Sequence, residues 1–178
     1  MTQQEFEGDH DPTELEPIPH QGGGLGLETI KQPIRNIMRT DVGTMRPDAT
    51  VRDAIREMAQ GHYGCVLVTD ASRLVGILSE RDVVTRLLDR EKDPKAELVR
   101  DHMTMEPEAA TVGDEIAYAL NIMSVGGFRH VPVIYPDGAL AGIVSIRDIA
   151  RLLVDHFREE ILTLAPKTRQ GPKTQHGG

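Results

Sequence analysis

One seven-residue stretch occurs twice in the chain, and no other feature constrains the fold as strongly. The first copy, residues 76–82, reads Gly-Ile-Leu-Ser-Glu-Arg-Asp, and the second, residues 142–148, reads Gly-Ile-Val-Ser-Ile-Arg-Asp. In each copy an apolar run ends in Ser-x-Arg-Asp, and an apolar pattern with helical spacing follows at once. This order predicts a strand, a tight turn and a helix, twice over.

The similarity between the two halves extends well beyond this motif, at an almost constant offset. Before the motif, the matching pairs are Met38 with Met103, Ala54 with Ala119, Met58 with Met123 and Gly61 with Gly126. One extra residue in the second copy, within residues 135–138, shifts all later matches by one position. The folded part is therefore predicted to consist of two copies of one unit.

Each copy is expected to fold in the order β-α-β-β-α. Apolar runs between turn residues predict strands, and apolar residues at i, i+3, i+4 and i+7 predict helices. In the first copy we expect a strand at 42–46, a helix from Thr50 to Gly61, strands at 65–69 and 74–78, and a helix at 80–89. In the second copy we expect a strand at 108–112, a helix with Ile116, Leu120 and Met123 on its apolar face, strands at 130–134 and 140–144, and a helix at 146–164.

The fold class that follows is a mixed α/β (α+β) fold made of two such units. The helices of one unit can cover only part of its small sheet, so the units are expected to pack against each other with pseudo-two-fold symmetry. The N-terminal part is acidic, carries no Lys or Arg before residue 30 and has few apolar residues, which predicts disorder. The expected parts are a disordered acidic leader, a first repeat, a second repeat and a flexible tail, at 1–29, 30–92, 93–165 and 166–178.

Charge and composition narrow the range of partners. The formal net charge is −8, and no stretch is basic enough to hold a nucleic-acid backbone. Cys65 is the only cysteine and lies inside an apolar run, which favours a small buried residue over a reactive thiol. No apolar run approaches the roughly 20 residues that a membrane-spanning helix needs. The expectation is a soluble cytoplasmic protein without membrane insertion.

The repeated motif fits two interpretations. In the first, Ser79 with Asp82 and Ser145 with Asp148 are capping boxes that only close the starts of two helices. In the second, each helix start is an anion site, because it presents free amides and a partial positive charge. The Ser hydroxyls and the adjacent guanidinium groups would then hold phosphate, and the carboxylates would accept from a ribose diol. The residues of this interpretation are Ser79, Arg81, Asp82, Ser145, Arg147 and Asp148.

The doubled Gly-h-h-Ser-x-x-Asp motif, the Met38 and Met103 lead-ins and the His130-Val131-Pro132-Val133 segment together resemble a tandem pair of cystathionine-β-synthase (CBS) domains, a Bateman module. The resemblance implies adenosine-containing ligands, with AMP, ADP or ATP first and S-adenosylmethionine or NAD next, in two clefts between the repeats. It adds Val42 and Thr44 to the first motif's site, and Ala109 and Ala110 to the second motif's site. It also implies that two modules pair into a disc-like homodimer.

Differences between the copies predict unequal sites. Glu80 aligns with Ile146, and an acidic side chain disfavours a nearby phosphate. Arg129 and His130 stand where the first copy has uncharged residues, and they would strengthen phosphate binding if they face the cleft. We therefore expect the site around Asp148 to bind more tightly.

The function favoured by the sequence is a stand-alone regulatory module that binds an adenine nucleotide and alters an effector protein. One alternative is a structural or dimerisation module whose motifs only cap helices, and another is an enzyme that acts on a nucleotide. The enzyme is disfavoured because the repeats use nearly all folded residues and no nucleophile or phosphate-loop motif is present. The seven histidines lack metal-ligand spacing, so neither a metal nor a catalytic cofactor is expected.

Overall fold

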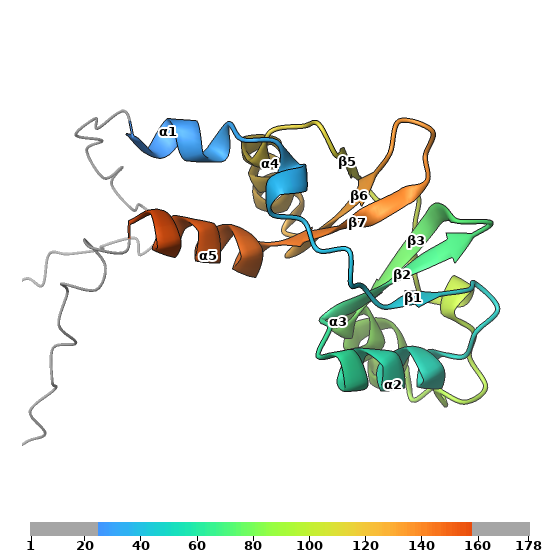
Figure 1. The fold of residues 1–178 in the computed structure, drawn as a ribbon. Helices are drawn as coiled ribbons and strands as arrows, with labels where there is room; N and C mark the ends of the chain where they lie inside the picture. Colours follow the sequence, from blue (N-terminus) through green and yellow to red (C-terminus); the bar gives the residue numbers. More distant parts are fainter. Residues whose placement is uncertain (1–24, 158–178) are drawn as a thin grey trace, which may run out of the picture.

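The computed structural model describes residues 25–157, which form two similar units (Figure 1). The first unit contains β1 (Thr44–Met45), α2 (Val51–Gly61), β2 (Cys65–Asp70), β3 (Arg73–Ser79) and α3 (Glu80–Asp82). The second contains β5 (Ala110–Thr111), α4 (Ile116–Gly126), β6 (His130–Ile134), β7 (Leu140–Ser145) and α5 (Ile146–His156). The predicted β-α-β-β-α order and the mixed α/β fold class are confirmed.

Each unit is built on a small mixed sheet. β2 is parallel to β1 and antiparallel to β3, and β6 has the same relation to β5 and β7. Both hairpins have an irregular register at the same place, between Val68 and Thr69 in the first and between Val133 and Ile134 in the second. The repeat is thus preserved in backbone detail as well as in sequence.

The helix after the first strand starts and stops where the sequence predicts. The amide of Asp53 donates to Thr50 Oγ1 at 3.2 Å, a cap of the kind that contributes about 1 kcal/mol. The helix ends at Gly61, and His62 follows in the left-handed conformation with a φ of 53°. Its apolar face is buried, as the spacing of Ala54 and Met58 predicts.

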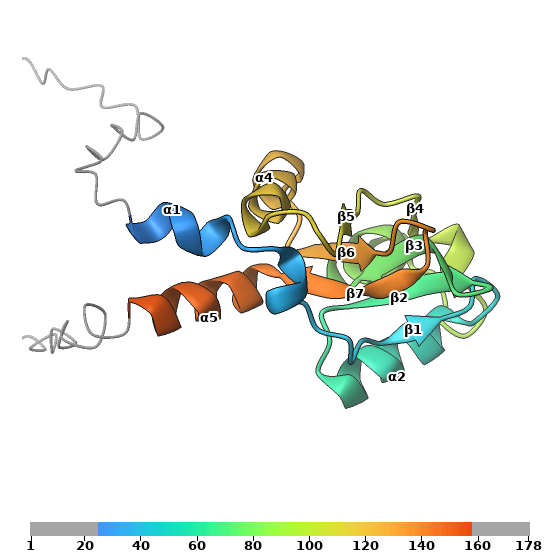
Figure 2. The ribbon, with the colours of Figure 1, turned by 45° about the horizontal axis from the view of Figure 1, so that its top comes forward.

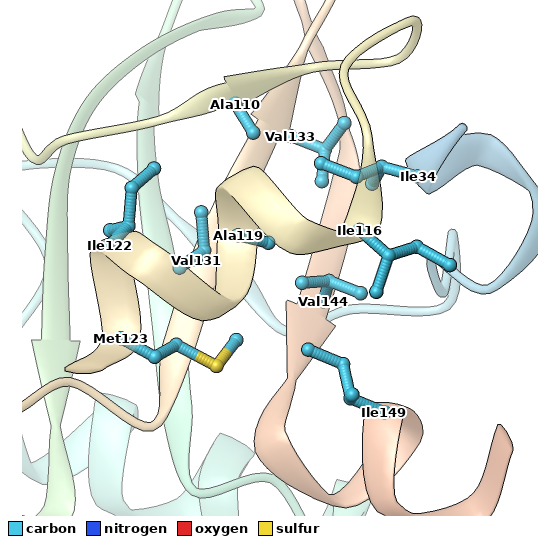
Figure 3. Packing of buried hydrophobic residues seen from close by; sticks show 10 residues of the cluster. All are labelled: Ile34, Ala110, Ile116, Ala119, Ile122, Met123, Val131, Val133, Val144 and Ile149. Carbon is cyan, nitrogen blue, oxygen red and sulfur yellow. The ribbon is translucent and has the colours of Figure 1, made fainter. Parts of the chain in front are cut away.

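The core of each unit is completed by the segment that precedes the other unit. Ile34, in a 3-10 turn at Ile34–Asn36, is fully buried in the core of the second unit, beside Val133 (Figure 3). Val99, in the 3-10 turn Val99–Asp101, is fully buried in the core of the first unit. Figure 1 shows the first of these crossings as the blue segment that runs from beside α4 to β1. We call residues 33–39 and 98–104 the two lead-ins.

Backbone hydrogen bonds fix both crossings. The amide of Arg39 donates to the carbonyl of Ile143 at 2.8 Å, and the reverse bond is 3.0 Å long. At the matching place in the first unit, β4 (Thr104–Met105) pairs with β3, and Thr104 lies opposite Ile77. The first sheet therefore has four strands and the second three. The two crossings are related by pseudo-two-fold symmetry, as predicted.

These crossings explain the glycine of the repeated motif. A Cβ on Gly142 would overlap the carbonyl oxygen of Arg39, and a Cβ on Gly76 would overlap the side chain of Met103. Glycine is needed at position 142 because the backbone of the first lead-in approaches the strand closely, whereas at Gly76 the side chain of Met103 would have to move.

The helix predicted at 80–89 forms, but it is not a continuous α-helix. Only Glu80–Asp82 form α-helix, Val83–Leu87 form a π-helical turn, and Leu88–Arg90 form a 3-10 turn. Thr85 Oγ1 donates to the carbonyl of Arg81 at 2.8 Å and so competes with the regular helical bonds. The corresponding α5 is a regular α-helix.

The start of the chain also differs from the expectation. Disorder was predicted through residue 29, but Leu25–Ile30 form the short helix α1, which lies beside α5 (Figures 1 and 2). Thr29 is only 2% exposed, and Lys31 Nζ lies 3.0 Å from Glu28 Oε1. The rest of the leader, the predicted helix beyond residue 157 and the tail at 166–178 lie outside the described residues. Between residues 25 and 157 no helix is long and apolar enough to cross a membrane.

Replacing Ile34 with Ala tests the crossing of the first lead-in. Because Ile34 is fully buried, the free energy of unfolding should fall by about 2–5 kcal/mol. Urea unfolding measures this loss, and hydrogen exchange should locate the loosened amides in β6 and β7. Val125→Ala is the control, because Val125 is 82% exposed and its truncation should change little. Loosening confined to the first sheet would contradict the crossing.

Candidate functional site

A cleft of about 780 Å³ lies at the seam between the two units. Cys65, Leu67 and Ile143 form a buried apolar cluster there and also line the cleft. The structure brings both copies of the motif to this cleft, together with three further predicted residues. The predicted residues that line it are Ser79, Arg81, Asp82, Ser145, Arg147, Asp148, Val42, Arg129 and His130.

Three predicted residues do not line the cleft. Thr44 is exposed on β1, Ala110 is fully buried in the core of the second unit, and Ala109 precedes β5. The chain just before each first strand lines the cleft instead. Val42 does so in the first unit, and Pro107 takes the matching place in the second. Applying the repeat offset to Val42 would have identified Pro107.

Both motifs form complete capping boxes. The amide of Asp82 donates to Ser79 Oγ at 3.2 Å, and the amide of Ser79 donates to Asp82 Oδ2 at 2.9 Å. The corresponding distances between Asp148 and Ser145 are 3.3 Å and 2.9 Å. Each carboxylate thus uses Oδ2 for the cap, and only its Oδ1 remains for another partner.

The two remaining carboxylate oxygens differ. Asp82 Oδ1 lies 3.2 Å from Nε of Arg86, which also lines the cleft. Asp148 Oδ1 has no hydrogen-bond or ion-pair partner within residues 25–157, although only 8% of the residue is exposed. Sequence reasoning missed Arg86, although it lies four residues after Asp82, the spacing at which opposite charges meet on a helix.

The cleft also holds guanidinium groups from both units. Arg81 Nη1 lies 3.5 Å from the carbonyl oxygen of Gly127, across the seam. No acidic partner for Arg81, Arg129 or Arg147 lies within salt-bridge distance in the part of the chain that the structure describes. Arg81 and Arg147 lie in the first turns of α3 and α5, and Arg129 directly precedes β6. Three such cations make the cleft suitable for an anion.

His130 lies at the start of β6 and contributes to the same wall of the cleft. Burial lowers the pKa of its imidazole, and Arg129 lowers the pKa further, against the opposing effects of Glu80 and Asp148. A Cβ on Gly64 would meet the imidazole ring, so the first strand of the opposing hairpin passes close to it. Near neutral pH the ring is therefore uncharged, with one nitrogen able to donate and the other able to accept.

Aromatic rings lie at the edge of the cleft. Tyr63 Oη donates to Asp41 Oδ1 at 3.0 Å, and the guanidinium of Arg39 lies 5.8 Å from the centre of the Tyr63 ring. Phe128, which matches Tyr63 in the second unit, also lines the cleft and is 48% exposed. An exposed aromatic ring at such a position offers a stacking surface for a planar group.

Cys65 is buried in the cluster under the cleft, as predicted from its surroundings. Burial raises the pKa of its thiol to about 12, with smaller contributions from Glu80 and Asp82. The thiol therefore stays protonated and unreactive at neutral pH. Within residues 25–157 there is no group of three or more His, Cys, Asp or Glu side chains that could hold a metal ion.

Two repeated units with a polar, cation-containing cleft at their seam define a tandem-repeat module. The sequence model of the CBS domain matches residues 34–89 and 99–155, which together make up more than half of the chain. The chain therefore belongs to the CBS domain family, as the resemblance predicted.

Similar proteins agree with this assignment. The chain is 40% identical over 123 residues to an uncharacterized 17.7 kDa protein of Acidianus ambivalens, covering 68% of this chain and 73% of that protein. It is 35% identical over 122 residues to the mitochondrial CBS domain-containing protein CBSX3 of Arabidopsis thaliana, covering 66% and 59%. A CBS domain protein of Pyrobaculum aerophilum, solved in complex with AMP, shares the fold with a TM-score of 0.64 at 23% identity, covering 71% and 98%.

Replacing His130 with Gln tests its environment through the pH dependence of stability. The pKa of His130 is lowered in the folded state, so the unfolded chain binds more protons once the pH falls below about 6.5. The parent should therefore lose stability as the pH falls through this range, and His130→Gln should lose less. Urea unfolding at pH 7.5 and pH 5.5 measures the difference. Equal losses in parent and variant would contradict the shift.

Proposed function

We propose that this protein is a regulatory module that binds an adenine nucleotide in the seam cleft. The observation that carries the proposal is the free Oδ1 of Asp148, which lies at a helix start in a cleft that also contains Arg147 and Arg129. A nucleotide needs an acceptor for its ribose diol and donors for its phosphate, and this cleft presents both.

In the proposed complex, the ribose hydroxyls donate to Asp148 Oδ1 and the phosphate accepts from Arg147 and Arg129. The amides at the start of α5 and the helix dipole add to the attraction for phosphate. His130, uncharged near neutral pH, is placed to hydrogen-bond the ligand without repelling either arginine. The apolar residues under the cleft give the base a surface on which to pack.

Adenine nucleotides are the first ligands to test, with AMP, ADP and ATP ahead of S-adenosylmethionine and NAD. The AMP complex of the P. aerophilum protein supports the choice of AMP, because that protein shares the fold. The described residues hold no metal cluster, and no catalytic step is proposed for the cleft.

Regulation is part of the same proposal. The cleft is lined by both units, so a ligand that contacts both can favour one relative placement of the units over another. Such a shift would be passed to an effector protein, and we propose that it acts in a cytoplasmic homodimer. The effector would have to bind the two placements with different affinity, as any allosteric coupling requires.

A structural or dimerisation module is the second candidate. Both motifs form the complete capping boxes that this function predicts, with no need for a ligand. In that case the cleft would stay empty, and the motif carboxylates would contribute only to helix stability.

A thermal-melt panel separates the two candidates. The panel is AMP, ADP, ATP, S-adenosylmethionine and NAD, each tested with the parent and with Asp148→Asn. A ligand at 100 times its Kd should raise Tm by about 5–11 °C. Asp148→Asn should reduce this shift to about half or less. It should leave the unliganded Tm nearly unchanged, because an amide oxygen can still accept from the Ser145 amide.

The control is Asp137→Asn, which removes an acidic group from an exposed turn outside the cleft. It should leave every ligand shift intact. If all ligands leave Tm unchanged, the nucleotide proposal is wrong and the capping function stands. If Asp148→Asn keeps the full shift, the ligand lies elsewhere.

A further inference from the structure

Both carboxylate oxygens of Asp82 have partners inside the protein. Its Oδ2 accepts from the amide and hydroxyl of Ser79, and its Oδ1 is paired with Nε of Arg86 at 3.2 Å. A ribose diol would have to share Oδ1 of Asp82 with the Arg86 guanidinium, which competes with it for that oxygen.

Arg86 is held in this position by two further bonds. Its Nη1 donates to the carbonyl of His102 at 2.9 Å, and its Nη2 donates to Thr104 Oγ1 at 3.2 Å. Both partners lie in the second lead-in, which is anchored in the first unit by the buried Val99. The guanidinium therefore has three fixed contacts, and it cannot leave Asp82 without losing a hydrogen bond to a buried part of the chain.

The second unit has no equivalent of Arg86. Leu152 occupies the matching position on α5, where it packs against the core of the second unit. Among the described residues 25–157, Asp148 Oδ1 consequently has no partner, although the capping box is the same as that of Asp82. The two motif carboxylates therefore differ because Arg86 in the first copy is replaced by Leu152 in the second.

We propose that Arg86 is a specificity-determining residue that closes the ribose position of the first motif. Each chain then binds one nucleotide, with its ribose on Asp148. This inference rests on the proposed function. It adds the number of nucleotide sites per chain and names Arg86 as the residue that determines this number. Glu80, next to Ser79, also disfavours a phosphate in the first half of the cleft.

The test is calorimetric titration with AMP, which reports the number of sites per chain. The parent should bind one AMP. Arg86→Leu, which installs the residue of the second unit, should bind two, and Arg86→Leu with Glu80→Gln should bind the second AMP more tightly. Adding Asp82→Asn to Arg86→Leu should return the count to one, because the new site depends on that carboxylate.

A second arm does not depend on the folding of the Arg86 variants. In the parent background, Asp82→Asn should leave AMP affinity unchanged within about threefold, whereas Asp148→Asn should weaken it by about tenfold or more. Arg90→Leu is the control for removing a positive charge, because Arg90 is exposed and does not line the cleft. Circular dichroism and melting confirm that each variant is folded.

The outcomes separate this inference from the function on which it rests. If AMP and the other nucleotides of the panel bind neither parent nor variant, the proposed function fails and the inference fails with it. If the parent already binds two AMP molecules, or if both Arg86 variants still bind one, only the inference is overturned. Weaker AMP binding in Arg86→Leu also overturns it, because Arg86 would then contact the ligand.

Discussion

The exchange of Ile34 and Val99 between the two units is the packing interaction on which the rest of the structure depends. Each side chain is fully buried in the core of the unit that it does not precede. Neither sheet therefore has a complete core of its own, and each lead-in must cross the seam to reach its site. The cleft exists because the crossings hold the two hairpins face to face over the cluster of Cys65, Leu67 and Ile143.

The residues of the repeated motif have three different roles in the structure. Its glycine lets the other lead-in approach the strand, its serine and aspartate close the start of the following helix, and its arginine lines the cleft. The structural and ligand-binding interpretations are therefore compatible, because the cap uses only one oxygen of each carboxylate. The second oxygen differs between the copies: it is paired with Arg86 in Asp82, and in Asp148 it has no partner among residues 25–157.

Repetition made most of the fold predictable from the sequence. Strands of five or more residues and the helix faces around Met58 and Met123 follow from periodicity, and the motif residues meet in one cleft because the copies are related by symmetry. The two-residue strand β4 has no period to detect, and the apolar spacing of residues 83–87 does not distinguish a π-helical turn from an α-helix. Pairing between Arg86 and the second lead-in depends on contacts between distant parts of the chain, so no local pattern indicates it.

The crossed lead-ins also govern how the chain can fold as it is synthesised. The first unit lacks a core residue until Val99 has been made, and Ile34 has no complete partner surface until the chain reaches Ile149. Closing loops of this length costs entropy before any burial compensates for it, which slows folding. The two units are thus expected to form as one cooperative body, and an interrupted chain would expose apolar surface from both.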